Sequence, residues 1–227
     1  MNHSVPNHRC LTGESEQHIH FLNPTLGIHK DMINAWQALQ QAAKSDGLDL
    51  QIVSGFRSFK KQQSIFEAKL SGRLPVFDLN QQAVDLKGLS FEDKVEQILL
   101  FSALPGASRH HWGTDIDVFS PSLITNEKLQ LEGWEYLPGG HQWPLTKWLD
   151  RYMMDFGFFR PYAKYQGGVA NEPWHLSYQP LANQFQTRHN SDCLKACLQA
   201  SDLADRAKLI DLVDTLYPKF ISNITEP

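Results

Sequence analysis

The chain has 227 residues, of which 41% are hydrophobic and 11% aromatic, and this length allows about 70–75% of the unfolded surface to be buried in one core. Its 21 basic and 25 acidic residues give a formal net charge of −4. The excess of basic residues that binding to a phosphate backbone needs is therefore absent, and we expect no nucleic-acid partner. No run approaches the roughly 18–20 consecutive apolar residues that span a bilayer, so we also expect no membrane span.

The N-terminus has neither the cationic start nor the apolar middle of a secretory signal, so we expect a cytoplasmic protein. A periplasmic location and release by lysis remain alternatives. Cys10, Cys193 and Cys197 form no C-x-x-C pair and are too few for a disulfide framework. We expect them to be free thiols.

The first half of the chain predicts two helices and a strand after an irregular start. Residues 1–28 are polar and show no clear period, so we expect an irregular segment. Apolar residues recur every three or four positions in residues 30–44, which predicts an amphipathic helix. Residues 48–53 are typical of a strand, and residues 59–70 predict the next helix, which ends at Ser71-Gly72.

In the second half, Ser90 and Asp93 are typical of a helix N-terminus and predict a helix there. Residues 114–118 alternate apolar side chains with two aspartates and predict a strand with one acidic face. Residues 144–156 predict a helix that a proline opens and a glycine closes. Residues 192–217 predict one or two terminal helices.

Strands and helices alternate without the regular βαβ order of a parallel sheet. We therefore expect an α+β fold with a central antiparallel sheet and flanking helices. We divide the chain into an irregular segment over residues 1–28, a catalytic domain over 29–185 and a helical extension over 186–227.

Three short segments contain the residue types of a hydrolytic metal site: SGFRS at 54–58, SRHHWGTDID at 108–117 and EPWH at 172–175. A catalytic zinc site takes three protein ligands from His, Asp or Glu and keeps a fourth position for water. These segments can supply two histidines and one aspartate, together with a further carboxylate.

We predict that the three metal ligands are His110, Asp117 and His175, with Glu172 as an uncoordinated carboxylate beside them. In a continuous strand, the seven positions between His110 and Asp117 would place them on opposite faces, so a turn at Trp112-Gly113 must intervene. The same parity argument predicts a bend at Pro173 between Glu172 and His175.

These segments resemble those of the D-alanyl-D-alanine carboxypeptidase family of zinc peptidases. This VanY-like branch belongs to a group that also holds lysostaphin-type enzymes and the hedgehog signalling domain, and the resemblance implies their fold. The family patterns are S-G-Y-R-S-x-x-x-Q, S-x-H-x-x-G-x-A-x-D and E-x-x-H. They are met by Ser54, Gly55, Arg57, Ser58, Gln62, Ser108, His110, Gly113, Asp117, Glu172 and His175.

Two positions depart from the family patterns. Phe56 stands where the family usually has tyrosine, and Asp115 stands where it usually has alanine. Asp115 could strengthen metal binding, orient His110 through a hydrogen bond or bind a substrate ammonium. The sequence does not distinguish among these roles. His111 lies beside His110, but the offsets from Ser108 and Gly113 select His110 as the ligand.

The resemblance implies a Zn²⁺ cofactor and a role for each matched residue. Glu172 would act as general base, and Arg57 would stabilise the charge that develops on the scissile carbonyl oxygen. Gln62 and Ser108 would contact the substrate. Taken alone, Arg57 could instead form an ion pair with a carboxylate such as Asp49.

The resemblance implies a zinc metallopeptidase that acts as a D,D- or L,D-carboxypeptidase. Its substrate would be the C-terminal peptide bond of peptidoglycan stem peptides or their precursors, which makes the cell-wall peptide its partner. Two alternatives are an endopeptidase of the endolysin kind and a zinc-bearing binding module without catalysis. The presence of both Glu172 and Arg57 argues against the binding module.

Overall fold

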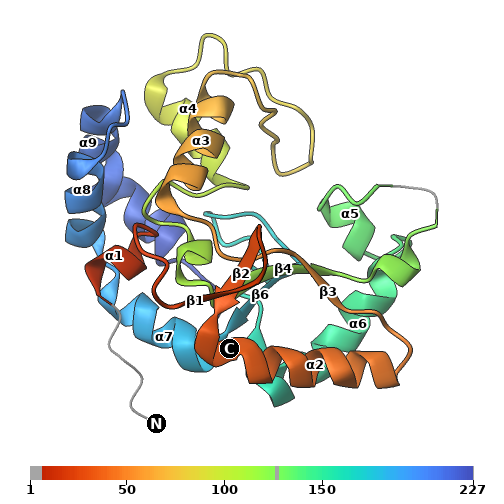
Figure 1. Ribbon diagram of the computed structural model, residues 1–227. Coiled ribbons are helices and arrows are strands. Elements are labelled where there is room, and N and C mark those ends of the chain that lie inside the picture. Colours follow the sequence, from red (N-terminus) through yellow and green to blue (C-terminus); the bar gives the residue numbers. More distant parts are fainter. Residues whose placement is uncertain (1–6, 126–127, 227) are drawn as a thin grey trace.

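The computed structural model describes residues 7–125 and 128–226, and residues 1–6 of the predicted N-terminal segment lie outside this part. Within the described residues, the main sheet has four strands in the order β3-β4-β6-β5, and every neighbouring pair is antiparallel. The strands are β3 (Gln51–Ser54), β4 (Asp115–Phe119), β5 (Phe158–Phe159) and β6 (His175–Tyr178). The expected α+β fold with a central antiparallel sheet is confirmed (Figure 1).

The register of β4 places two predicted ligands side by side. Asp117 lies opposite His175 of β6 on one side and opposite Ser54 of β3 on the other. Directly paired residues of antiparallel strands have their side chains on the same face of the sheet. Asp117 and His175 therefore project together, although they are far apart in the sequence.

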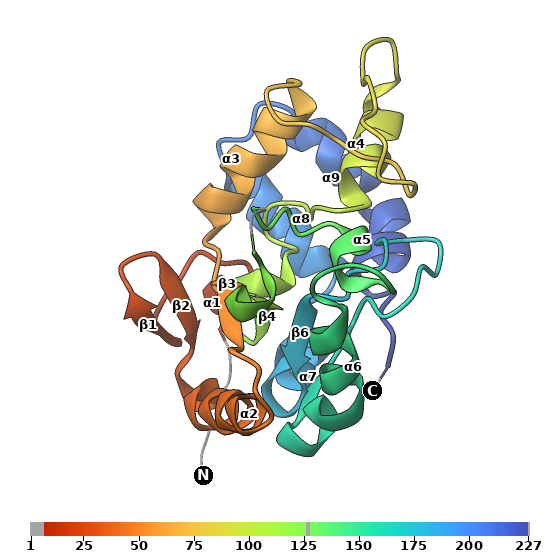
Figure 2. The ribbon, with the colours of Figure 1, turned by 90° about the vertical axis from the view of Figure 1, so that its right-hand side faces the viewer.

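The face of the sheet opposite the aspartates is covered by α2 (Ile33–Ser45) and α6 (Trp143–Tyr152), which lie on one side of the sheet in both views (Figures 1 and 2). Ile116 and Val118 of β4 are fully buried in a core cluster with Leu39 of α2 and Leu149 of α6. The alternation in β4 thus directs its apolar residues into this core and leaves Asp115 and Asp117 for the site.

On the other side of the sheet, four helices share a second core (Figure 2). They are α3 (Phe59–Leu70), α4 (Phe91–Leu99), α8 (Ser191–Ala200) and α9 (Arg206–Leu216). Phe66, Ile98, Leu194 and Leu209 are buried in this cluster, so the C-terminal helices pack directly on α3 and α4. The boundary predicted after residue 185 falls inside α7 (Gln179–Arg188), a helix that the sequence analysis did not identify.

The segment over residues 1–28 is not irregular in the part that the structure describes. It contains α1 (His8–Leu11) and a hairpin of β1 (Ile19–Asn23) and β2 (Leu26–His29). The hairpin is attached to the site segments, because the backbone N–H of Phe56 donates to Gly27 and that of His29 donates to Gly113. These long-range hydrogen bonds order the segment. Its few apolar residues show no alternation from which the strands could be predicted.

The helix predictions are confirmed with small shifts at their ends. Helix α3 has the predicted bounds, and α4 begins after Ser90, whose side chain accepts a hydrogen bond from the backbone N–H of Asp93. Helix α2 begins later than expected because residues 30–32 form a 3-10 turn. The loop over 121–140 contains the short α5 (Gly133–Tyr136), and its residues 126–127 lie outside the described part.

Candidate metal centre

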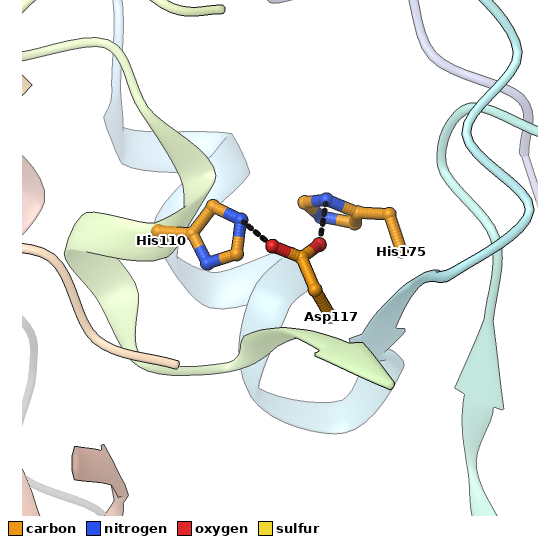
Figure 3. Close-up of side chains that lie close together, drawn as sticks. All are labelled: His110, Asp117 and His175. Atoms are coloured by element: carbon orange, nitrogen blue, oxygen red, sulfur yellow. Dashed lines mark ion pairs between the residues drawn. The ribbon is translucent and has the colours of Figure 1, made fainter. Parts of the chain in front are cut away.

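His110, Asp117 and His175 form one buried cluster, and a ligand atom from each lies within 4.8 Å of the others. His110 Nε2 lies 3.3 Å from Asp117 Oδ2, and His175 Nδ1 lies 3.3 Å from Asp117 Oδ1. Figure 3 shows the two imidazole rings facing the two carboxylate oxygens from either side. The three predicted ligands are thus brought together from a 3-10 helix (Arg109–Trp112), β4 and β6.

Gly113 provides the turn that brings His110 into the cluster. It ends the 3-10 helix with φ of 67°, a left-handed conformation that favours glycine. A Cβ at this position would lie 2.5 Å from the side chain of Ile19 and 2.9 Å from the backbone nitrogen of His29. The turn predicted at Trp112-Gly113 is therefore present, and the hairpin packs directly against it.

Each histidine directs one ring nitrogen toward the cluster and engages the other elsewhere. His110 Nδ1 donates to the Gly55 carbonyl oxygen at 2.9 Å, and His175 Nε2 donates to Asp115 Oδ1 at 3.0 Å. The nitrogens that face Asp117 are then free to act as metal ligands. Asp117 Oδ1 is buried and accepts no hydrogen bond from the described residues, so the donor set fits a zinc ion.

One of the predicted roles of Asp115 was to orient His110. The structure shows instead that Asp115 bonds His175. Its carboxylate is fully buried and accepts from Arg109 Nε at 2.7 Å and from Thr114 Oγ1 at 2.7 Å. Arg109 also donates to Ser177 Oγ at 2.8 Å and stacks over the Trp112 ring. Arg109 is not predicted from the sequence as a site residue, although an arginine near a buried extra carboxylate is a natural partner for it.

The electrostatics of the cluster keep the aspartates charged. Burial alone would raise the pKa of Asp115, but Arg109 and His175 hold it well below its usual range. Asp117 is likewise buried, and His110 and His175 lower its pKa. Burial opposes a charge on His175, yet the carboxylates of Asp115, Asp117 and Glu172 beside it raise its pKa well above the ordinary value. Without a metal, these carboxylates therefore favour the protonated form of His175.

We expect the melting temperature of the metal-free protein to fall as the pH rises above about 6.5. The raised pKa of His175 adds stability that is complete below its unfolded pKa and is lost as the pH rises through the folded pKa. Burial lowers the pKa of His111 to about 3 and that of His189 to about 4, so these residues influence stability at lower pH.

Thermal melting in EDTA and in zinc, between pH 6 and 9, tests this expectation. Zinc should remove most of the fall, because the metal replaces the proton on His175. The variant His175→Gln should melt at a temperature that changes little with pH over this window. A metal-free wild-type protein whose melting temperature stays constant would contradict the assignment of a proton to His175.

Glu172 lies at the edge of the cluster, with its side chain 12% exposed. Its Oε2 is 3.4 Å from His175 Nδ1, the nitrogen that faces Asp117. The predicted bend at Pro173 is present, since the backbone N–H of His175 donates to the Glu172 carbonyl oxygen at 3.1 Å. The backbone N–H of Glu172 donates to the carbonyl oxygen of Tyr162, whose ring packs edge-on against His175. Glu172 is thus held beside the candidate metal position.

Arg57 follows β3 and points its guanidinium into the same region. Its Nη1 donates to Gln62 Oε1 at 2.8 Å and its Nη2 donates to Ser54 Oγ at 3.3 Å, so the alternative of an ion pair with Asp49 is not observed. Burial lowers its pKa, which Asp117 and Glu172 partly oppose. The residues bonded to Arg57 are neutral, and its charge remains available to a bound substrate.

The backbone of Arg57 is fixed by the 3-10 helix of the metal segment. Its N–H donates to the His110 carbonyl oxygen at 3.1 Å, and its own carbonyl oxygen accepts from His111 Nδ1 at 2.6 Å. His111 is fully buried, and its Nε2 accepts from the backbone N–H of Gly106. His111 is therefore a positioning residue for Arg57, a role that the sequence did not reveal.

The two predicted substrate contacts have different positions. Ser108 lines the cavity at the cluster, so a substrate contact remains a prediction for it. Gln62 is fully buried and is not among the described residues that line this cavity. Its amide oxygen accepts from Arg57 and its amide nitrogen donates to the Ala103 carbonyl oxygen. We therefore correct its role from substrate contact to positioning of Arg57.

A cavity of about 280 Å³ opens onto the cluster. Arg57, Glu172 and the three candidate ligands line it, and so does Lys69 of α3. The loop over 121–143, which the sequence left without a role, contributes Gln130, Leu131, Glu132 and Gly133 to the wall. Leu131 has φ of 58°, an uncommon conformation for a residue other than glycine. This loop therefore shapes the space available to a ligand.

In the part of the chain that the structure describes, no helix is both long and apolar enough to cross a bilayer.

Residues 25–181 match the family of VanY D-alanyl-D-alanine carboxypeptidases. An uncharacterized protein of Haemophilus influenzae is 34% identical over 121 residues, which cover 52% of this chain and 92% of that protein.

A D-alanyl-D-alanine carboxypeptidase of Enterococcus faecalis is 27% identical over 165 residues, which cover 71% of this chain and 52% of that relative. The chain therefore spans about half the length of the enterococcal protein. Two solved VanY structures of the VanB type superpose with a TM-score of 0.53 at 24% identity, over 81% of this chain and 89% and 92% of theirs. One is a complex with D-alanine-D-alanine, and the other is a mutant in complex with Zn(II). At this identity, the superposition establishes the fold.

Proposed function

Because the chain belongs to the VanY family of D-alanyl-D-alanine carboxypeptidases, we propose that it is a zinc-dependent enzyme that removes D-alanine from the C-terminus of peptidoglycan stem peptides or their precursors. The observation that carries this proposal is the convergence of His110, Asp117 and His175 in one buried cluster, with Glu172 at its edge. The complexes of VanY relatives with D-alanine-D-alanine and with Zn(II) support the proposed substrate and metal.

His110, Asp117 and His175 would hold the zinc ion, which when bound would lower the pKa of a water molecule and polarise the scissile carbonyl. Glu172 would accept a proton from the attacking water and deliver it to the leaving amine. Arg57 would donate hydrogen bonds to the carbonyl oxygen as negative charge develops there. Asp115 accepts a hydrogen bond from His175 Nε2, which would leave Nδ1 as the nitrogen that could hold the metal.

We expect the zinc-loaded enzyme to shorten a soluble stem peptide that ends in D-alanine by one alanine, with release of free D-alanine. Mass spectrometry of the products measures this loss, and Glu172→Gln serves as the blank. A peptide that ends in L-alanine tests whether the cleaved bond must have the D configuration.

Cross-linked cell wall distinguishes the endopeptidase alternative in the same assay. A carboxypeptidase should release terminal alanine and leave cross-bridges intact, whereas an endolysin-type enzyme should cut within them. If the products of the wild-type enzyme match those of the Glu172→Gln blank on all of these substrates, the peptidase proposal is refuted.

A further inference from the structure

Lys69 is a basic residue that lines the cavity of the candidate active site. Phe59, Gln62, Phe66 and Lys69 follow one another at three or four positions along α3, so they share the face that packs inward. The first three are buried, whereas Lys69 is half-buried and lines the cavity with Arg57 and Glu172. A lysine at the end of an otherwise inward face is not explained by packing.

The Lys69 ammonium has no hydrogen bond or ion pair within the residues that the structure describes. By contrast, three other lysines have carboxylate partners at 2.7 Å, in the pairs Lys60–Asp202, Lys195–Asp214 and Lys219–Glu96. Burial lowers the pKa of Lys69, while Glu172 partly opposes this effect. An ammonium group that is partly removed from water is costly to keep without a partner, so its position favours an anionic ligand.

The anion cannot be a carboxylate that the reaction already uses. Asp117 faces both ligand histidines, and Glu172 lies beside the candidate metal position. The substrate of a peptidase carries carboxylates of its own. We propose that Lys69 binds a carboxylate of the substrate peptide, an inference that rests on the proposed function.

The position of Lys69 along α3 gives an approximate scale for its separation from Arg57. Lys69 lies seven positions after Gln62, which holds Arg57, and this corresponds to a rise of about 10 Å along the helix. An extended peptide advances about 3.3 Å per residue, so the carboxylate lies within about three residues of the scissile bond. Two sources meet this condition: the C-terminal α-carboxylate and a carboxylate carried by a nearby acidic residue.

Lys69 also borders a second cavity of about 340 Å³, together with Lys87 and Lys94. Its strongest electrostatic neighbours are nevertheless Glu172 and Arg57, which line the first cavity and not the second. These neighbours suggest a competing role for Lys69, in which it tunes Glu172 electrostatically. Such a role would change kcat and its pH dependence, whereas binding of a substrate carboxylate acts on KM.

Steady-state kinetics of zinc-loaded Lys69→Met on a D-alanine-terminated stem peptide tests the proposal. We expect KM to rise about 10- to 100-fold with little change in kcat, because one charge-assisted contact is lost. Lys69→Arg should recover most of the affinity. Lys61→Met is the matched control, since Lys61 is exposed on α3 away from the cavity, and it should leave both constants unchanged. If Lys69→Met fails to fold, Lys69→Gln replaces it.

Competitive inhibition by two peptide analogues identifies the source of the carboxylate. One analogue has its C-terminus amidated and the other has its acidic side chain amidated. The ratio of inhibition constants between Lys69→Met and wild type should fall to about one only for the analogue that lacks the recognised carboxylate. Either assignment supports the proposal.

Three results distinguish failure of the proposed function from failure of the Lys69 proposal. A wild-type enzyme that cleaves no stem peptide refutes the proposed function, and the Lys69 proposal falls with it. An active wild type whose KM is unaffected in Lys69→Met, or whose kcat and pH profile change instead, overturns only the Lys69 proposal. A ratio that stays high for both amidated analogues also overturns it, because the effect would then be independent of a peptide carboxylate.

Discussion

Replacement of Glu172 by glutamine is expected to lower kcat by about 100- to 10,000-fold while the protein still binds one zinc ion per chain. The three candidate ligands are His110, Asp117 and His175, so the metal does not depend on Glu172. The carboxylate lies 3.4 Å from His175 Nδ1, where it can take a proton from a water at the metal. Glutamine keeps the size and polarity of the side chain but cannot accept that proton.

Measurement of kcat together with elemental analysis of the purified protein tests both parts of this expectation. Glu16→Gln is the control, because Glu16 is exposed in the N-terminal segment and does not line the cavity. Loss of zinc from Glu172→Gln would show that Glu172 is a ligand. Turnover close to that of the wild type would show that another group moves the proton.

The cluster could be predicted from the sequence because its geometry depends on local turns. Gly113 marks the turn that follows His110, and Pro173 marks the bend between Glu172 and His175. Once these turns are placed, pairing of β4 with β6 brings Asp117 opposite His175. The sequence therefore contained most of the information needed to assemble the candidate ligands.

The positions of Gln62 and Asp115 were not predictable in the same way. The side chain of each residue bonds one group that is close in the sequence and another that is more than 40 positions away. Gln62 bonds Arg57 and the carbonyl oxygen of Ala103, while Asp115 bonds Arg109 and His175. A sequence pattern gives the face on which a side chain lies, but it does not say which partner satisfies a buried polar group.

A similar reason explains which elements of the fold were missed. Helix α4 was predicted because Ser90 caps it and apolar residues mark its inward face. In β1, by contrast, the side chains are exposed or half-buried along the whole strand, so no alternation reveals it. The hairpin is ordered by backbone contacts with the site segments, such as that from His29 to Gly113. Such backbone contacts do not require particular residue types, so they cannot be predicted from the sequence.

Replacement of Asp115 by alanine is expected to lower the free energy of unfolding by about 3–5 kcal/mol, because it leaves the buried Arg109 without its charged partner. The same change removes the acceptor that fixes the His175 ring, so zinc affinity should fall about 10- to 100-fold. Urea denaturation of the metal-free protein measures the first effect, and competition with a chelator measures the second.

Two variants separate the contributions of Asp115. Asp115→Asn keeps an acceptor for His175 but loses the ion pair with Arg109, so it should lower stability more than zinc affinity. Lys60→Met removes the exposed ion pair with Asp202 and should leave the unfolding midpoint nearly unchanged, since exposed pairs are screened by water. If Asp115→Ala bound zinc as tightly as the wild type, the ring of His175 would be held by its metal-facing contacts alone. The carboxylate that departs from the family pattern would then serve only the fold.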